Sequence, residues 1–295
     1  MNTEHGAALR ELPDGTLRAS NSRADLEVDP QDGGRLTSLR IDGIEILGSS
    51  PQNPGMPAGF FYGAFLMAPF IGRTRRGQFT FDSVGHQLPR NVGDHAMHGL
   101  VYDTGWNPID GGVETAFDDR WPFGGGVRQR FSLTEDALVV TAEVFNDDRP
   151  MPAALGFHPW FLDQLSTGER AVFEFEPKER FICDDDGIPV DSIPGGGPRP
   201  WDDSFRGVAH SPVIRWGGRL TVTIESDHDH WIVCETMPNS FCIEPLSGGV
   251  NALADGSATI VEPGTPLALT MTLRWNSTPD TIASTDARTG TGTAR

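Results

Sequence analysis

The chain is poor in positive charge, and lysine is almost absent from it. Its 295 residues include 23 basic and 41 acidic side chains, which gives a net charge of −18 at pH 7. Lys178 is the single lysine. An acidic protein repels polyanions and anionic lipid headgroups. The sequence therefore disfavours nucleic acid and membrane surfaces as partners.

Cysteine and long apolar runs are also scarce. The three cysteines, Cys183, Cys234 and Cys242, form no CxxC pair, which disfavours a disulfide framework or a structural zinc site. No run reaches the roughly 18 apolar residues that cross a bilayer, and the first twenty residues do not resemble a signal peptide. These features favour a cytoplasmic protein without a membrane segment.

Helical periodicity is missing as well, since no segment of about 12 residues shows it. Residues 36–47 instead alternate apolar and polar side chains around Asp42-Gly43, which is typical of a β-hairpin. Residues 127–134 and 137–146 indicate a second hairpin. Further strands are expected at residues 171–176, 220–225, 231–235, 241–244 and 267–275. The pattern predicts an all-β fold, a large antiparallel β-sandwich.

The ends of the chain differ in composition from its body. We expect residues 1–12 to be loosely ordered and residues 13–275 to form a single β-sandwich domain. Residues 276–295 are rich in Ser, Thr, Asp, Ala and Gly, and this composition predicts a disordered tail. Residues 184–199 are rich in Asp, Gly and Pro and are expected to form a long loop.

A histidine in an aromatic run is the first candidate for chemistry. His158 lies in Gly-Phe-His-Pro-Trp-Phe, and aromatic surroundings desolvate an imidazole and shift its pKa. Trp160 in the same run offers the kind of flat apolar face on which sugars stack. A histidine that simply belongs to the core is the alternative.

Glu244 is the second candidate, because it ends an apolar strand and precedes Pro245. An unpaired buried carboxylate is too costly to keep. Glu244 is therefore expected either in an ion pair, for example with an arginine, or pointing into a pocket. A carboxylate and an imidazole suit general acid–base chemistry, and ordinary pKa values of about 4.3 for Glu and about 6.5 for His already lie in the required order.

Other polar residues could bind a small polar molecule. Arg73 offers several fixed donors, although it also fits a solvated basic loop. His98 precedes a glycine and follows a polar stretch with Asn91, and a purely structural histidine is the alternative. Asp202 and Asp203 lie between aromatic residues and could accept hydrogen bonds from hydroxyls or form a turn.

No motif calls for a cofactor. Residues 227–230 read Asp-His-Asp-His, but residues i and i+2 of a strand share a face, which leaves only one pair of ligands on each side. The triple-glycine runs lack the lysine and helix of a phosphate loop. We therefore predict neither a metal nor a nucleotide.

Taken in order, these segments resemble the aldose 1-epimerase (galactose mutarotase) family over roughly residues 30–275. The motifs that carry the resemblance are Pro69, Gly72-Arg73, Gly77-Gln78-Phe79, Met97-His98-Gly99, His158-Pro159-Trp160-Phe161, Asp202-Asp203-Ser204-Phe205 and Glu244-Pro245. The resemblance implies the large β-supersandwich of that family, a small sugar as substrate and no cofactor.

The resemblance also implies roles for single residues. Glu244 would be the general base at the C1 hydroxyl of the sugar, and His158 the general acid at the ring oxygen. His98 would hold the ring oxygen. The substrate-binding set would comprise Arg73, His98, Asp202, Trp160 and Asn91, with Asp203 as a rival to Asp202.

Three departures from the family pattern indicate a divergent branch. Met97 stands where leucine is usual, Gly72 where asparagine is frequent, and Ser-Gly-Gly-Val-Asn at 247–251 in place of Thr-Gly-x-Pro. Two other functions stay open. An epimerase for hexose 6-phosphates would need arginines such as Arg75, Arg76 and Arg90 at the pocket rim, and a non-catalytic carbohydrate-binding protein would use the same fold for recognition alone. The sequence indicates no particular oligomeric state.

Overall fold

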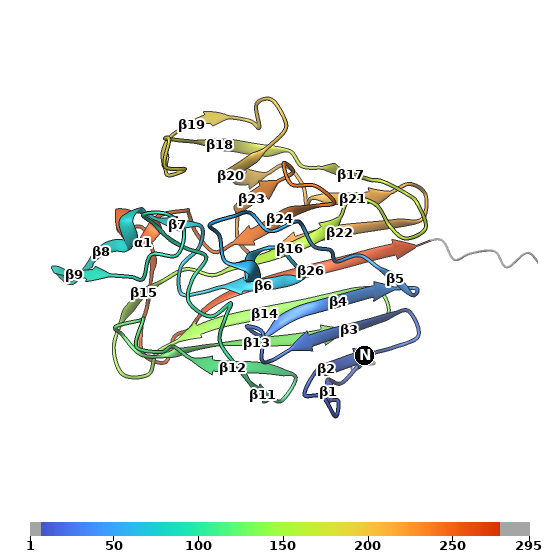
Figure 1. The fold of residues 1–295 in the computed structure, drawn as a ribbon, viewed down its shortest axis with the longest axis horizontal. Coiled ribbons are helices and arrows are strands. Elements are labelled where there is room, and N and C mark those ends of the chain that lie inside the picture. Colours follow the sequence, from blue (N-terminus) through green and yellow to red (C-terminus); the bar gives the residue numbers. More distant parts are fainter. Residues whose placement is uncertain (1–6, 278–295) are drawn as a thin grey trace, which may run out of the picture.

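The computed structural model describes residues 7–277 and shows two large sheets that pack face to face (Figure 1). The first sheet has 12 strands. In spatial order it contains β1 (Arg10–Glu11), β2 (Leu17–Ser20), β3 (Ala24–Asp29), β4 (Arg35–Ile41), β6 (Ala64–Met67), β16 (Gly156–Leu162), β24 (Ser240–Leu246), β23 (His230–Cys234), β20 (Asp202–Val208), β18 (Pro177–Cys183) and β19 (Pro189–Pro194), with β5 (Ile44–Glu45) beside β4. Residues 1–6 and 278–295, which belong to the predicted end segments, lie outside the described residues.

The second sheet has eight strands. Its order is β11 (Asn107–Ile109), β12 (Gly112–Ala116), β13 (Gly126–Leu133), β14 (Ala137–Phe145), β26 (Leu267–Ser277), β22 (Leu220–Ser226), β21 (Val213–Trp216) and β17 (Ala171–Glu174). Three short ribbons complete the strands: β7 (Arg73–Thr74) with β10 (Ala96–Met97), β8 (Gln78–Phe81) with β9 (Val84–Gln87), and β15 (Met151–Ala153) with β25 (Thr259–Val261). Neighbouring strands in these sheets run antiparallel.

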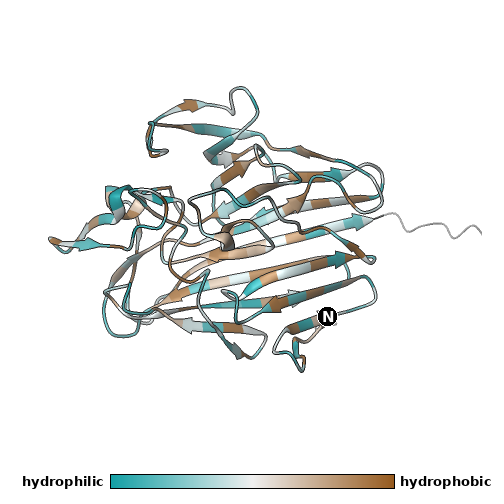
Figure 2. Ribbon diagram, in the orientation of Figure 1, coloured by the Kyte–Doolittle hydropathy of each residue, from teal (hydrophilic) through white to brown (hydrophobic). Residues whose placement is uncertain are grey.

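The main core lies between the two sheets because the long strands alternate in polarity. Along β14 and β26 every second residue is buried, and Figure 2 shows the corresponding alternation of hydrophobic and hydrophilic residues along the ribbons. Side chains from both sheets join one hydrophobic cluster. This is the packing of a β-sandwich, as the sequence predicted.

Three central strands of the first sheet, β6, β16 and β24, are buried on both faces. Their inner face contributes Phe157 and Ile243 to the main core. Their outer face contributes Trp160 and Cys242 to a second hydrophobic cluster, which the segments around Phe60 and Tyr102 complete. The polar candidates on these strands therefore lie beneath a cover of loops.

The expected hairpins are confirmed, whereas the expected long loop is wrong. Residues 36–47 contain β4 and β5, and both turn residues have positive φ, 50° at Asp42 and 78° at Gly43. Residues 184–199 contain strand β19, which pairs with β18. This edge strand has no buried position and begins and ends with proline, so its sequence lacks the alternation that identifies a strand.

Helices contribute little to the described residues. Their one α-helix is α1 (Ala252–Asp255), and two short 3-10 turns cover Ala58–Phe60 and Arg75–Gly77. Between residues 7 and 277, no helix is long and apolar enough to cross a membrane.

Candidate active site

The register of two central strands brings the two proton-handling candidates together. β16 and β24 pair Trp160 with Cys242, and this register places Glu244 opposite His158. Because side chains alternate along a strand, all four of these residues lie on the same face of the sheet. That face is the outer one, so the four side chains lie under the loops rather than in the main core.

The same row continues across the next two strands. Cys234 of β23 pairs with Cys242, and Asp202 of β20 pairs with Cys234. Trp160, Cys242, Cys234 and Asp202 thus form one row across four strands, next to the row that contains His158 and Glu244. These two rows define what we call the cavity floor.

A cavity of about 270 Å³ lies on this floor. Its volume is just below the range of about 300–1,000 Å³ that is usual for ligand pockets, which suits a small molecule. The ribbon β7–β10 supplies Arg73 and Met97 to its wall, and His98 follows directly. The floor contributes His158, Glu244 and Asp202. Segments that are far apart in the sequence therefore converge on one cavity.

Glu244 and His158 are in direct contact. The distance from Glu244 Oε1 to His158 Nε2 is 3.4 Å, and the side chains are only 1% and 7% exposed. Glu244 Oε2 has no hydrogen-bond partner among the described residues. Of the two interpretations of Glu244, the structure supports a carboxyl in the cavity whose neighbour is an imidazole and not an arginine.

Burial changes the protonation of this pair. Burial, and secondarily the charge of Asp202, raises the pKa of Glu244 well above its ordinary value of 4.5. Burial, and secondarily His98, lowers the pKa of His158 well below 6.5. Both shifts oppose the order expected from unperturbed groups. Burial therefore favours the neutral pair, a protonated carboxyl beside a neutral imidazole.

His98 is held in an unusual backbone conformation. Its φ is 59°, a left-handed value that is uncommon for residues other than glycine and often marks functional sites. Its backbone N–H donates to the Gly72 carbonyl at 2.9 Å, and its ring meets Phe60 edge-on with centroids 4.8 Å apart. Burial, followed by the charge of Arg73, lowers the pKa of His98 to about 3. His98 is therefore a neutral imidazole at ordinary pH.

The two adjacent aspartates have different surroundings. Both border the cavity, but Arg180 binds the Asp203 carboxylate at 2.9 Å. Asp202 is exposed at the cavity. Partial burial of its carboxyl nevertheless raises its pKa, while a hydrogen bond with Cys234 and the charge of Arg73 act in the opposite direction. Asp202 is thus the aspartate whose carboxyl is available to a ligand.

Arg73 is free to bind a ligand. Among the described residues its side chain makes no hydrogen bond or ion pair, although it lines the cavity. The backbone at Gly187 approaches its guanidinium so closely that a Cβ at this position would overlap Nη1. A glycine at 187 therefore leaves the space that the Arg73 side chain uses to reach the cavity.

The sequence matches the aldose 1-epimerase family model over residues 24–229. The chain belongs to the aldose 1-epimerase family. The match includes the segments of Arg73, His98, His158 and Asp202, and it ends before Glu244. No curated protein matches the chain in a sequence comparison.

Solved structures share the fold of this aldose 1-epimerase family member. A putative aldose 1-epimerase from Escherichia coli K12 is 20% identical, with a TM-score of 0.73 over 89% of this chain and 99% of that one. A galactose mutarotase-like protein from Clostridium acetobutylicum is 14% identical, with a TM-score of 0.76 over 92% and 99%. Galactose 1-epimerase from Lactobacillus acidophilus is 14% identical, with a TM-score of 0.72 over 91% and 97%. At these identities the likeness shows the fold.

One departure from the family pattern has a structural explanation. Gly72 has a φ of 51°, and a Cβ there would lie 2.8 Å from Cγ2 of Val250. Val250 therefore fills the space into which a side chain at residue 72 would point. The departures at residue 72 and in the 247–251 segment therefore lie at one place in the structure, where Gly72 faces Val250.

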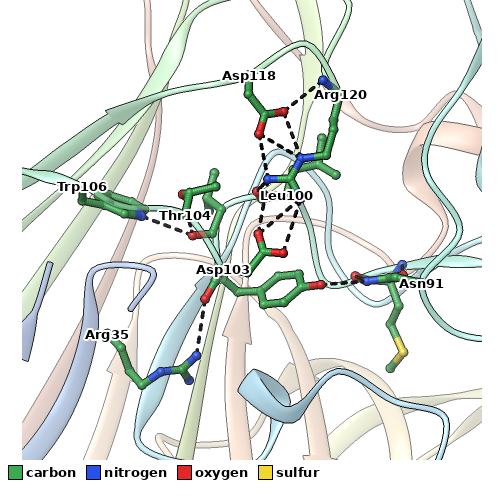
Figure 3. A network of polar contacts seen from close by, with 11 residues as sticks. Arg35, Asn91, Leu100, Asp103, Thr104, Trp106, Asp118 and Arg120 are labelled. Carbon is green, nitrogen blue, oxygen red and sulfur yellow. Dashed lines mark hydrogen bonds and ion pairs between the residues drawn. The ribbon is translucent and has the colours of Figure 1, made fainter. Parts of the chain in front are cut away.

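The structure does not bring Asn91 into the cavity. Its amide nitrogen donates to the Met97 carbonyl at 3.0 Å and to the Tyr102 hydroxyl at 3.2 Å, and its oxygen accepts from the Met97 N–H at 2.8 Å. Figure 3 shows Asn91 and, in the same network of polar contacts, Arg120 bridging Asp118 and Asp103. Asn91 thus fixes the backbone one residue before His98, which explains why a polar residue is needed there.

Trp160 presents only its ring to the cavity. Its indole N–H donates to the Phe60 carbonyl at 2.7 Å, and its ring centroid lies 5.2 Å from that of His158. The polar end of the side chain is therefore occupied within the protein. A flat apolar face remains for a ligand.

Sequence reasoning missed three residues that support the site. Phe65 stacks on His158 at 4.5 Å, and Cys242 Sγ lies 3.5 Å from His158 Nδ1. The fully buried Arg35 pairs with Asp32 at 2.8 Å and donates to two loop carbonyls, one of which appears in Figure 3. Cys242 could have been found, since it stands two residues before Glu244 and so shares its face. Nothing in the sequence around Arg35 indicates its role.

Three side chains at the cavity floor have the chemistry of metal ligands. His158, Cys242 and Glu244 each offer a ligand atom, and these atoms lie within 4.8 Å of one another. The two ring nitrogens, however, face different partners: Nδ1 faces the sulfur and Nε2 the carboxyl. A metal bound to either nitrogen would have to displace one contact. The arrangement is a row of polar groups in contact.

The two histidines of the Asp-His-Asp-His segment at 227–230 face other groups. His230 Nδ1 lies 3.0 Å from Asp229, and His228 Nε2 meets the Ala268 carbonyl.

Proposed function

We propose that this protein interconverts the α and β anomers of a free aldose by general acid–base ring opening. The family and the fold support a mutarotase-type isomerase. The observation that carries the proposal is the contact between Glu244 Oε1 and His158 Nε2, 3.4 Å apart at the floor of a sugar-sized cavity.

This separation suits the chemistry of a cyclic sugar. The C1 hydroxyl oxygen and the ring oxygen are bonded to the same carbon, so the groups that serve them must also be neighbours. Glu244 would remove the proton of the C1 hydroxyl, while His158 would give a proton to the ring oxygen. The bond between C1 and the ring oxygen then breaks, and an aldehyde forms. Rotation about C1–C2 and closure by the reverse proton transfers produce the other anomer.

The protonation states that burial favours for Glu244 and His158 fit this sequence of steps. After ring opening, Glu244 holds the proton and His158 is neutral, and burial favours the same distribution when no sugar is bound. The hydroxyls of a bound sugar would offer hydrogen bonds to the pair and so support the ionised form that starts the next turnover. The neutral pair and the ionised pair carry the same number of protons, so no net proton exchange with solvent is needed.

The remaining cavity residues would orient the sugar. Arg73 offers several N–H donors to hydroxyl oxygens, and Asp202 offers an acceptor. The neutral imidazole of His98 would contact the ring oxygen, since its Nδ1 has no partner among the described residues. The Trp160 ring would pack against the C–H face of the sugar. No metal or organic cofactor takes part in this proposal.

The charges around the cavity favour a free sugar over a hexose 6-phosphate. Arg73 is the cation that lines the cavity. Arg75 is already bound by Asp184 and Asp186, and Arg90 lies 3.3 Å from Asp94. Arg75 and Arg90 are thus paired with neighbouring carboxylates, and the third candidate, Arg76, does not line the cavity.

Loss of Glu244 tests the proposed function. Exchange between the anomers of a panel of aldoses, followed by polarimetry, should be accelerated by the protein. Glu244→Gln should lower kcat by about 10²- to 10⁴-fold, because a general base contributes about that much. His230→Ala, outside the cavity, is the matched control and should remain active. Sugar binding without accelerated exchange would instead indicate a carbohydrate-binding protein, and near-normal activity of Glu244→Gln would remove this residue from the mechanism.

A further inference from the structure

A buried thiol touches the proposed acid on the side away from the carboxyl. Cys242 Sγ lies 3.5 Å from His158 Nδ1, and the cysteine is fully buried. It is the one side chain that forms a hydrogen bond with that nitrogen in the part of the chain that the structure describes. His158 thus lies between a thiol and a carboxyl, and each occupies a different ring nitrogen.

Aromatic packing fixes the plane of the His158 imidazole, but it does not fix which ring nitrogen lies on which side. Phe65 stacks on the ring with an interplanar angle of 21°, and His98 meets it edge-on at 5.1 Å. A half-turn of the imidazole about its bond to Cβ would keep the ring in the same plane and preserve this packing. The half-turn would, however, remove Nδ1 from the sulfur and Nε2 from Glu244. The polar contacts therefore decide which nitrogen faces the cavity.

The proton on the ring matters as much as its orientation. In a neutral imidazole one nitrogen carries hydrogen and the other accepts. A nitrogen that exchanges a proton with the sugar must be free to accept it back, so the permanent hydrogen has to be on the opposite nitrogen. For His158 that nitrogen is Nδ1, and its hydrogen needs an acceptor.

We propose that Cys242 is a positioning residue for His158: its sulfur accepts the hydrogen of Nδ1 and so leaves Nε2 as the nitrogen that exchanges a proton with the sugar. This inference rests on the proposed function, which it refines. It assigns a role to a residue that touches neither the sugar nor the reacting atoms.

The choice of sulfur has a chemical consequence. Burial raises the pKa of the Cys242 thiol well above its ordinary value, so the acceptor is a neutral thiol and not a thiolate. Sulfur is a weak hydrogen-bond acceptor. A carboxylate in this position would stabilise the imidazolium and make it a poorer donor. The thiol instead orients the ring and leaves the imidazolium ready to give up its proton.

The tautomer of His158 can be measured directly, without substrate. Long-range ¹H–¹⁵N correlation spectra of the histidine rings distinguish hydrogen on Nδ1 from hydrogen on Nε2, and the signals of His158 are identified by their loss in His158→Asn. The wild-type protein should show hydrogen on Nδ1 at a pH where the ring is neutral. Hydrogen on Nε2 would overturn the inference, whether or not the protein is active.

Variants then test the consequence for turnover. Cys242→Ala should populate the other tautomer and lower kcat by about 10- to 100-fold with little change in KM. Cys242→Ser supplies an oxygen acceptor and should recover most of this loss. Ile243→Val, which removes a similar volume from the opposite face of β24, should change neither the tautomer nor kcat.

Two results would contradict the role of the sulfur. An alanine variant with unchanged ring signals and unchanged kcat would show that Cys242 only fills space. Equal losses in the alanine and serine variants would show that volume matters and an acceptor does not. Failure of the proposed function appears differently, as a wild-type protein that accelerates no anomer exchange while its Nδ1 tautomer remains measurable.

Discussion

The carboxyl of Glu244 and the imidazole of His158 meet where almost no water reaches them. Desolvation disfavours the charged form of each group, which raises the pKa of one and lowers that of the other. At the scale of single residues this is why the neutral forms of both groups, and not an ion pair, are favoured. Ordinary pKa values alone would have predicted an ionised Glu244 beside a more readily protonated His158.

The buried carboxyl should reduce the stability of the protein as the pH rises. The pKa of Glu244 is higher in the folded than in the unfolded state, so its contribution is fully present below about pH 4.5 and is lost as pH rises through the folded value. Gln does not titrate. Urea unfolding of Glu244→Gln should therefore show a gain over wild type of about 1 kcal/mol or more at pH 8, and a smaller gain at pH 5. If the stability gain of the variant over wild type is smaller at pH 8 than at pH 5, this explanation is contradicted.

At the scale of strands, local patterns reveal the elements but not their neighbours. The alternation in residues 127–146 and 267–275 was sufficient to predict β13, β14 and β26. The contact of Glu244 with His158 depends instead on β24 pairing with β16, about eighty residues earlier in the chain. A single sequence does not encode that register in any local signal. The site residues could be recognised one by one, while their geometry, the thiol under His158 and the buried Arg35 required the structure.

The close approach of two loops gives a prediction at the same scale. Gly72→Ala places a methyl group against Val250 and puts alanine at a φ of 51°, so it should lower the free energy of unfolding by about 1–3 kcal/mol. Val250→Ala removes the obstacle and should restore part of this loss, while the backbone strain remains. Thermal or urea unfolding of the two single variants and the double variant measures the coupling. Additive losses would show that the two residues do not share the space.

At the scale of the whole molecule, the proposed preference for a neutral sugar rests on charge. The chain carries a net charge of −18, and the carboxyls of Glu244 and Asp202 accompany Arg73 in the cavity. A phosphate group would meet repulsion on approach and find Arg73 as the one guanidinium among the residues that line the cavity. The fold places the site on the outer face of the larger sheet, where loops can vary to fit different sugars without disturbing the core between the sheets.

Ionic strength should change the preference for glucose over glucose 6-phosphate. At low salt, kcat/KM for glucose should exceed that for glucose 6-phosphate by about tenfold or more, and added salt should narrow the difference because it screens repulsion. Parallel assays of the two sugars across a salt series test this expectation. A preference for the phosphate ester at low salt would instead support an epimerase for hexose 6-phosphates.

The central claim is that Glu244 and His158 act as one unit on a bound sugar. A double-mutant cycle in kcat for anomer exchange, with Glu244→Gln, His158→Asn and the double variant, tests it most directly. Residues that act together show strongly non-additive losses, so the double variant should be hardly slower than the slower single variant. Losses that multiply, or a single variant with near-normal turnover, would contradict the claim.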